Sequence, residues 1–355
     1  MPIRTVEVAG APIEMGRQYG EELRQEAREM IGTRLELAAK AAEALNPPRD
    51  IQWCLDLAAE TFPALESYPG TVFDELEGIS QATGLDLLEL IIGNGWTDFR
   101  DLMGVRDQPH NCTSLVVGPK FSADGHVYLA QTWDMNVSAA PYVVLVRRQP
   151  TDGPRTISLT TAGCLSLVGI NEHGIAVGNT NLVPTDARPG VFYLAIIHEA
   201  LRQSSIDDAV TAIASGHRMS GHYYYVGEPN DTFSGLETAA IAFDEVAWSQ
   251  RHYAHTNHYE SGRLMESGVT TAAGANSVGR KERCDGLLSA HEGGITVTDI
   301  SQILGDHEGE HPICRHADPG AEYATLASAI MCPAERRMWV STGQPCTSPL
   351  EPVGF

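Results

Sequence analysis

Cys112 is the residue whose type and position best suit covalent chemistry. It stands between a polar stretch without periodicity, residues 100–111, and an apolar run that begins at Ser114. A thiol where a loop meets a strand can be presented to a substrate, whereas a lone cysteine is more often a small buried hydrophobe. Cys112 is therefore a candidate nucleophile, and a half-buried cysteine at the start of a strand is the alternative.

Two groups of histidines are candidate metal ligands. His255 and His258 flank a Thr-Asn pair, and three further histidines lie within residues 307–316. Neither group has the spacing of a strong zinc motif such as HExxH, and strand alternation would put His255 and His258 on opposite faces. We expect no metal and no cofactor, and a metal-dependent hydrolase that uses the His255–His316 region is kept as an alternative.

Other common catalytic motifs are absent from the sequence. There is no GxSxG nucleophile elbow, no GxxxxGK[ST] phosphate loop and no GxGxxG after a predicted strand. These absences weaken the interpretation as a serine hydrolase, a nucleotide-dependent enzyme or a dinucleotide-dependent enzyme.

The composition restricts the partners and the compartment. The 355 residues carry a formal charge of −22, and such an acidic chain repels the phosphates of nucleic acids. No apolar stretch is long enough to span a membrane, and the first residues do not form a secretory signal. The seven cysteines include no CxxC pair, which favours reduced thiols in a cytoplasmic protein.

Hydrophobic periodicity predicts the elements that must position Cys112. The first third is predicted to be helical, because apolar residues recur at steps of three and four from Met15 to Ile31. Strands begin after residue 112, and Asp124-Gly125 is suited to a hairpin turn. Helices are also predicted at 53–61, 72–83, 192–202, 206–215, 278–288 and 297–304. Strands are predicted at 114–117, 127–133, 142–147, 156–161, 223–226, 239–243, 251–256, 326–331 and 338–341, and residues 169–182 are predicted to be strand-rich with a turn at Gly174. This order favours helices packed on mainly antiparallel sheets.

Several stretches, taken in order, resemble the isopenicillin-N acyltransferase family of N-terminal-nucleophile hydrolases. They are Gly78-Ile79-x-Gln81-Ala82, Cys112-Thr-Ser, Gln131-Thr-Trp133-Asp134, His255-Thr-Asn257-His258, Ile313-Cys-Arg315, Thr325-Leu-Ala-Ser-Ala-Ile-Met331 and Gly343-Gln-Pro345. The resemblance implies an α+β fold, a four-layer αββα sandwich made as an inactive precursor. It also implies autocatalytic cleavage of the Asn111–Cys112 bond, which leaves a mainly helical segment, 1–111, associated with a catalytic portion, 112–355, in one globular unit.

The resemblance also implies roles for individual residues. Cys112 would be the nucleophile, Asn257 the side chain of the oxyanion hole, Asp134 the acidic residue beside the nucleophile and Arg315 an arginine of the active site. The sequence departs from the family pattern at Asn111, where we expect Gly, at Ser114, which replaces Thr, and at Cys314, which replaces Ser. Four further residues are expected to be scaffold with a secondary chance of shaping the pocket: Glu237, Ser277, Arg280 and Arg283.

The leading hypothesis is an autoprocessing cysteine amidohydrolase that cleaves a small N-acyl compound through a thioester. An acyltransferase that moves an acyl group from acyl-coenzyme A or an amide to an amine is an alternative, because the same site serves both reactions. A non-catalytic scaffold with an inert thiol is another. The expected partners are the small-molecule substrate and the two fragments of one precursor, with a homo-oligomer left open.

Overall fold

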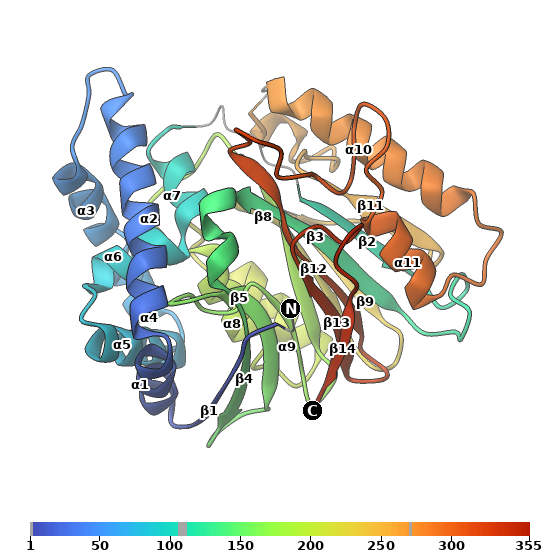
Figure 1. Ribbon diagram of the computed structural model, residues 1–355, viewed down its shortest axis with the longest axis horizontal. Coiled ribbons are helices and arrows are strands. Elements are labelled where there is room, and N and C mark those ends of the chain that lie inside the picture. The colour runs from blue at the N-terminus through green and yellow to red at the C-terminus, as the bar shows by residue number, and fades with distance from the viewer. Residues whose placement is uncertain (1–2, 106–111, 270–271) are drawn as a thin grey trace.

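Two β-sheets lie face to face in the computed structural model, which describes residues 3–105, 112–269 and 272–355 (Figure 1). The eight-stranded sheet has the order β1-β4-β5-β6-β7-β8-β9-β10, and the six-stranded sheet has the order β11-β2-β3-β12-β13-β14. Neighbouring strands are antiparallel except for β1 and β4, which are parallel. The mainly antiparallel sheets predicted from the sequence are therefore confirmed.

The elements have the following bounds. The strands are β1 (Thr5–Gly10), β2 (Thr113–Val117), β3 (Tyr128–Asn136), β4 (Val143–Pro150), β5 (Thr156–Thr161), β6 (Val168–Asn171), β7 (Ala176–Leu182), β8 (Gly221–Gly227), β9 (Phe233–Thr238), β10 (Phe243–Glu245), β11 (His252–His255), β12 (Tyr323–Cys332), β13 (Arg337–Thr342) and β14 (Glu351–Gly354). The α-helices are α1 (Pro12–Glu22), α2 (Arg24–Glu43), α3 (Ile51–Ala59), α4 (Phe62–Ser67), α5 (Gly70–Thr83), α6 (Leu87–Asn94), α7 (Trp96–Leu102), α8 (Tyr193–Ala200), α9 (Ile206–Ser215), α10 (Ala272–Ser289) and α11 (Val297–Leu304). The short 3-10 helices are η1 (Val137–Tyr142) and η2 (Met265–Ser267).

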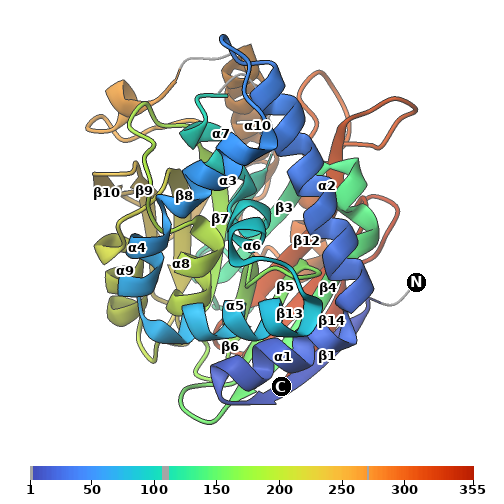
Figure 2. The same cartoon turned by 90° about the vertical axis from the view of Figure 1, so that its left-hand side faces the viewer.

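Strand β2 shows why the molecule has four layers. Val116 belongs to the large core between the sheets, whereas Leu115 and Val117 on the opposite face pack in a second core with residues of α10 and α11. A strand that is buried on both faces needs a covering layer on each side. Helices α10 and α11 cover the outer face of the six-stranded sheet, and Figure 2 shows α1, α2, α5 and α6 as a layer in front of the eight-stranded sheet. The predicted four-layer αββα α+β fold is confirmed.

Local sequence signals fix several helix ends. Helix α6 begins with a capping box in which Asp86 accepts from the backbone and Glu89 bonds back to the cap. Helix α5 ends at Gly84, whose φ of 73° is the left-handed conformation that glycine adopts easily. Helices α1 and α5 approach closely, because a Cβ at Gly78 would lie 2.1 Å from the backbone oxygen of Ile13.

Two sequence predictions about the strands are wrong. No strand was expected before residue 112, yet β1 adds a parallel strand to β4 at the end of the sheet (Figure 1). A strand was expected at 239–243, but this run connects β9 to β10, and the amide of Ala239 bonds to the carbonyl of Ala242. Its small apolar residues form a tight connection rather than a strand. Among the described helices, none is both long and apolar enough to cross a bilayer.

Candidate active site

Cys112 stands immediately before β2, and its side chain is only 8% exposed. Its Sγ lies 3.9 Å from the backbone oxygen of Asp134 on β3, the strand that pairs with β2. Burial, assisted by the negative charge of Asp134, raises the pKa of the thiol to about 12. The thiol is therefore neutral at physiological pH and needs a base before it can act as a nucleophile.

A small cavity lies beside this thiol. Its volume of about 20 Å³ is enough for roughly one water molecule. The lining combines polar groups with aromatic rings from α7, β3, β7, α8 and β8: Thr97, Cys112, Trp133, Asp134, Met135, Asn179, Asn181, Tyr193 and His222. The sequence predicted Cys112 and Asp134 as neighbours, and the structure brings them to the same cavity.

Among the described residues, one side-chain hydrogen bond holds Asp134, and the other carboxyl oxygen has no partner. Its Oδ1 accepts from the Thr325 hydroxyl on β12 at 2.7 Å, while Oδ2 is buried and has no hydrogen-bond partner among the described residues. Burial raises the pKa of Asp134 to about 7, although the Thr325 hydrogen bond and the charges of Arg280 and Arg315 act to lower it. A carboxyl group of this kind changes charge near neutral pH, as groups at catalytic sites often do.

Arg280 on α10 connects Cys112 to Asn257, the predicted oxyanion residue. Its Nη1 donates to the backbone oxygen of Cys112 at 2.6 Å and to the hydroxyl of Thr113 at 3.0 Å. Its Nη2 donates to Oδ1 of Asn257 at 2.8 Å. Burial lowers the pKa of Arg280 to about 10, so the side chain remains a cation at neutral pH.

The sequence expected Arg280 to be scaffold and assigned the active-site arginine to Arg315. Arg315 contacts Thr325 through its backbone, donating from N to Oγ1 at 2.8 Å and accepting at its O from the Thr325 amide at 2.9 Å. The sequence pattern that could have indicated Arg280 is its spacing of three residues from Ser277. This spacing places both side chains on the same face of α10, toward Asn257. Ser277 Oγ accepts from the Asn257 backbone amide at 2.7 Å.

Asn257 lies just beyond the end of β11, with its side-chain amide oriented from two sides. Its Oδ1 accepts from Arg280, and its Nδ2 donates to the backbone oxygen of Asn181 at 2.8 Å. Asn181 lines the cavity beside Cys112, whereas Asn257 does not. Asn181 thus uses one of the two hydrogens on Nδ2.

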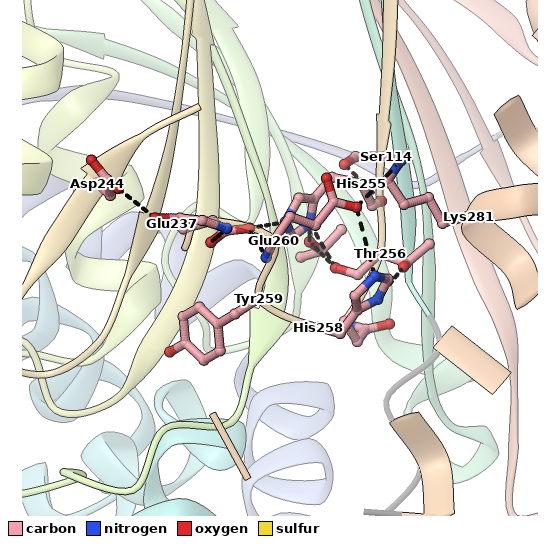
Figure 3. Close-up of polar contacts among 12 residues, drawn as sticks. Ser114, Glu237, Asp244, His255, Thr256, His258, Tyr259, Glu260 and Lys281 are labelled. Carbon is pink, nitrogen blue, oxygen red and sulfur yellow. Dashed lines mark hydrogen bonds and ion pairs between the residues drawn. The ribbon is translucent and has the colours of Figure 1, made fainter. Parts of the chain in front are cut away.

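A buried network holds the segment that carries Asn257 (Figure 3). Glu237 Oε1 lies 2.8 Å from His255 Nε2 and accepts from the Glu260 amide at 2.7 Å, and its Oε2 accepts from the Ser261 amide at 2.9 Å. His255 Nδ1 lies 2.8 Å from the Thr256 carbonyl. Glu237 thus fixes the loop rather than facing the cavity, and both ring nitrogens of His255 are engaged by protein oxygens.

His255 and His258 lie closer together than strand alternation predicted. Strand β11 ends at His255, so the chain turns before His258 and the two rings stack with centroids 6.4 Å apart. His258 Nδ1 lies 2.8 Å from the hydroxyl of Ser277. These contacts occupy both ring nitrogens of His255 and Nδ1 of His258.

The other predicted site residues lie outside the lining of the cavity. Ser114 donates from its hydroxyl to the backbone oxygen of His255 at 3.1 Å, and Cys314 directs its thiol at Cys346, with the sulfur atoms 3.5 Å apart. Arg283 on α10 pairs with Asp306. Asn111, the first residue of the predicted cleavage bond, lies outside the described residues.

A buried histidine–aspartate pair at the cavity had no counterpart among the sequence predictions. His222 Nε2 lies 2.6 Å from Asp98 Oδ1, and Asp98 Oδ2 accepts from the Tyr193 amide at 2.8 Å. The ring of His222 stacks on Tyr193, and its Nδ1 is buried with no hydrogen-bond partner among the described residues. The two partners are 124 residues apart, so only the fold brings them together.

A larger and mainly apolar pocket adjoins this cavity at two places, one on α7 and one on β3. Trp96 and Asn136, which line the pocket, are the chain neighbours of Thr97 and Met135, which line the cavity. The pocket has a volume of about 770 Å³, within the usual range for small-molecule sites. Its walls come from α2, α7, the segment after β3 and residues 321–323: Leu37, Lys40, Ala41, Ala44, Leu45, Trp96, Arg100, Gly104, Val105, Asn136, Val137, Ser138, Ala321, Glu322 and Tyr323.

Solved structures of two hydrolases are similar to this chain in part. A mutant of conjugated bile acid hydrolase from Clostridium perfringens has 10% sequence identity over 69% of this chain and 92% of its own, with a TM-score of 0.49. Penicillin V acylase from Agrobacterium tumefaciens has 11% identity over 69% of this chain and 86% of its own, with a TM-score of 0.46. No substrate carries over at such identities.

The sequence comparisons give one family. No curated protein matches the chain. Residues 121–347, well over half of the chain, match the family described as acyl-coenzyme A:6-aminopenicillanic acid acyl-transferase. The match begins after Cys112 and includes Asp134, Asn257 and Arg280. The chain therefore belongs to the acyl-coenzyme A:6-aminopenicillanic acid acyl-transferase family.

Proposed function

We propose that this protein is an autoprocessing amide hydrolase with Cys112 as its N-terminal nucleophile. The observation that carries the proposal is the pair of bonds from Arg280, which ties the carbonyl of Cys112 to the side chain of Asn257. A single buried cation thereby sets the nucleophile and an oxyanion donor in a fixed relation, as acyl transfer requires. The cavity and the carboxyl group of Asp134 beside the thiol support the same interpretation.

The first proposed reaction is self-cleavage. The Cys112 thiol adds to the carbonyl carbon of Asn111, and the amide nitrogen leaves with the thiol proton, which gives a thioester and a free α-amine. Water then hydrolyses the thioester, releasing the Asn111 carboxylate and restoring the thiol. A water in the cavity would lie among Cys112, Oδ2 of Asp134 and Nδ1 of His222, the last two of which lack other partners among the described residues. His222, oriented by Asp98, is suited to accept a proton from it.

The second proposed reaction is turnover of substrate. The new α-amine has an ordinary pKa of about 7.7–8.0, so near neutral pH it can take the proton from the thiol of the same residue. The sulfur attacks the substrate amide, the amine product leaves with that proton, and water opens the acyl-enzyme thioester. Asn257 would donate to the oxyanion and Asp134 would hold the α-ammonium group. Arg315 is proposed to contribute only its charge to Asp134.

We infer that the acyl group of the substrate occupies the large pocket beside Trp96. Its wall toward α2 is aliphatic, with Leu37, Ala41 and Leu45, whereas Lys40 and Arg100 place cations at the same pocket. This lining suits an apolar acyl chain in a compound that also carries an anionic group. Replacing Ala41 by Trp should raise KM for long-chain N-acyl substrates at least tenfold and leave acetyl substrates unaffected. Equal effects on both classes would argue against the pocket.

An acyltransferase is the second candidate, and the family description favours it. The same acyl-enzyme can be opened by an amine in place of water, so the two functions differ only in the acceptor. Added amine acceptors separate the two candidates: a transferase forms the new amide faster than free acid, whereas a hydrolase gives acid alone.

All seven cysteines are unpaired, which supports the proposal that the protein works in the reducing cytoplasm.

The decisive experiment is intact-mass analysis and N-terminal sequencing of the purified protein. We expect two fragments that begin at the natural N-terminus and at Cys112, and only one full-length chain for Cys112→Ala. Cys54→Ala is a matched control, because Cys54 is a buried cysteine on α3 that does not line the cavity. An uncut chain whose hydrolytic activity survives Cys112→Ala would refute the proposal.

A further inference from the structure

Three side chains, one of them the chain neighbour of Arg315, form a cluster of metal-ligating groups. The ligand atoms of His307, His316 and Cys346 all lie within 4.8 Å of one another. They come from three segments: the turn after α11, the segment before β12 and the loop after β13. Because only the fold brings these segments together, their spacing in the sequence matches no zinc motif.

The distances within the cluster are close to those of a zinc coordination shell. His316 Nε2 lies 3.2 Å from Cys346 Sγ, and Cys314 Sγ lies 3.5 Å from the same sulfur. Tetrahedral zinc, with bonds of about 2.3 Å to sulfur and about 2.0–2.1 Å to nitrogen, holds a sulfur and a nitrogen about 3.6 Å apart and two sulfurs about 3.8 Å apart. Small outward movements of these groups would therefore admit the ion.

His307 already has the hydrogen bond that orients a metal-bound histidine. Its Nδ1 lies 3.0 Å from the backbone oxygen of Gly305, so this nitrogen carries the proton and donates. The lone pair is then on Nε2, which remains for a metal. A histidine ligand whose second ring nitrogen donates to a carbonyl is the usual arrangement around zinc.

The backbone around the cluster holds its segments close together. The amide of Cys314 donates to the carbonyl of Asp306 at 2.7 Å, and the Asp306 carboxylate accepts two hydrogen bonds from Arg283, at 2.9 and 2.6 Å. A Cβ on Gly305 would lie 3.4 Å from the backbone of Cys346, so the turn and the loop are in contact. The three segments are thus held near one another before any ion binds, so that only side-chain movements are needed to complete the site.

We propose that His307, His316 and Cys346 bind a zinc ion, with Cys314 as the fourth ligand after rotation of its side chain. Two imidazoles and two thiolates form a ligand set that selects zinc over magnesium or calcium, which prefer oxygen. Four protein ligands leave no open position for a substrate, so the ion has a structural role. The sequence predicted no metal, and this inference replaces that expectation.

The zinc site supports the active site through Arg315. This residue lies between two of the ligands, and its backbone N and O both bond to Thr325, whose hydroxyl donates to Asp134. Fixing Cys314 and His316 therefore fixes Thr325, and with it the Asp134 carboxyl group. Zinc acts here on the position of a carboxyl group and takes no part in the reaction itself.

Elemental analysis of the full chain, purified without a histidine tag and dialysed against metal-free buffer, tests the proposal. We expect about one zinc per chain, and at least a tenfold lower content in Cys346→Ser and in His316→Ala. His173→Ala and Cys54→Ala, which alter an exposed histidine and a buried cysteine outside the cluster, should keep full occupancy. Removing zinc with a chelator should lower the melting temperature of the wild type and leave that of Cys346→Ser unchanged.

Three results would overturn the proposal. One is the absence of stoichiometric zinc from protein produced with zinc in the medium. Another is full zinc content in both cluster variants. The third is a Cys314–Cys346 disulfide in non-reduced peptide maps, because sulfurs 3.5 Å apart are also near enough to be oxidised. Zinc content is measured equally well in Cys112→Ala, so this test is independent of the proposed catalysis.

Discussion

Arg280 donates to the backbone oxygen of Cys112 at 2.6 Å across 168 residues of sequence. The same guanidinium donates to Asn257 at 2.8 Å. A lysine ammonium group is a compact point charge and cannot reproduce the planar fork that reaches both groups. The geometry of the site therefore depends on arginine at this position and not only on a positive charge.

We predict that Arg280→Lys lowers kcat/KM about ten- to a hundredfold. The variant keeps the charge but loses at least one buried charged hydrogen bond, each of which contributes about 1.5–3 kcal/mol. Steady-state kinetics measure the effect, and circular dichroism checks the fold. Arg155→Lys is the matched control, because Arg155 forms an exposed ion pair with Glu172. Wild-type kinetics in Arg280→Lys would show that charge alone suffices.

Asn257→Ala tests the oxyanion role. Loss of one oxyanion donor typically costs about 2.7–4 kcal/mol of transition-state stabilisation, so kcat should fall about 10²- to 10³-fold with little change in KM. Asn230→Ala, at an exposed turn before β9, should behave as the wild type. If KM rises while kcat is retained, Asn257 binds the ground state instead of stabilising the oxyanion.

The pKa of Asp134 predicts how stability depends on pH. Its folded value of about 7 exceeds the ordinary value of about 3.9, so the folded chain binds more protons than the unfolded chain between these values. Asp134 therefore lowers the free energy of unfolding as pH rises from about 4 to about 7. In the uncut Cys112→Ala background, the stability of Asp134→Asn relative to its parent should rise by roughly 3 kcal/mol from pH 5 to pH 8.

Urea unfolding at several pH values measures this difference. Asp124→Asn in the same background is the control, because the pKa of Asp124 is lowered rather than raised, chiefly by hydrogen bonds from Tyr128 and His126 that outweigh its burial. The contribution of Asp124 to the free energy of unfolding should rise with pH, and it should do so only below about pH 4. Parallel pH profiles for the Asp134→Asn variant and its parent would mean that the carboxyl group is ionised throughout this range.

Glu237→Gln should destabilise the fold and slow catalysis together. Glu237 is fully buried, and its two oxygens face His255 and the amides of Glu260 and Ser261. A glutamine points an NH₂ group at one of these donors, which costs at least about 2 kcal/mol for a buried polar group left unsatisfied. Thermal unfolding and kcat are the measurements, with Glu245→Gln on the exposed strand β10 as the control. An unchanged melting temperature would exclude a structural role.

Local signals predicted much of the fold. The helical period before residue 84, the glycine that ends α5 and the Asp124-Gly125 turn between β2 and β3 all act over a few residues, and the structure agrees with each. Strand β1 was missed because only six residues form it, and its partner β4 lies far along the chain. Nothing local distinguishes a short edge strand from the start of a helical segment.

The site was predictable only where a residue carries chemistry of its own. Cys112 could be named from its type and position, and Asp134 from the family resemblance, and the structure places both at one cavity. Arg280 was named only as scaffold and His222 not at all, because the contacts of both side chains are made across the fold. Arginine on a helix and histidine in a strand are common in any protein, and only three-dimensional contacts give them meaning.

The parallel strand β1 has a consequence for the production of the protein. Without residues 5–10, β4 would become the edge of the eight-stranded sheet and expose the unpaired N–H and C=O groups of a run that begins Val-Val-Leu-Val. Such an edge is a template for intermolecular pairing. The portion 112–355 synthesised alone should therefore aggregate, whereas the same portion synthesised together with residues 1–111 should remain monodisperse.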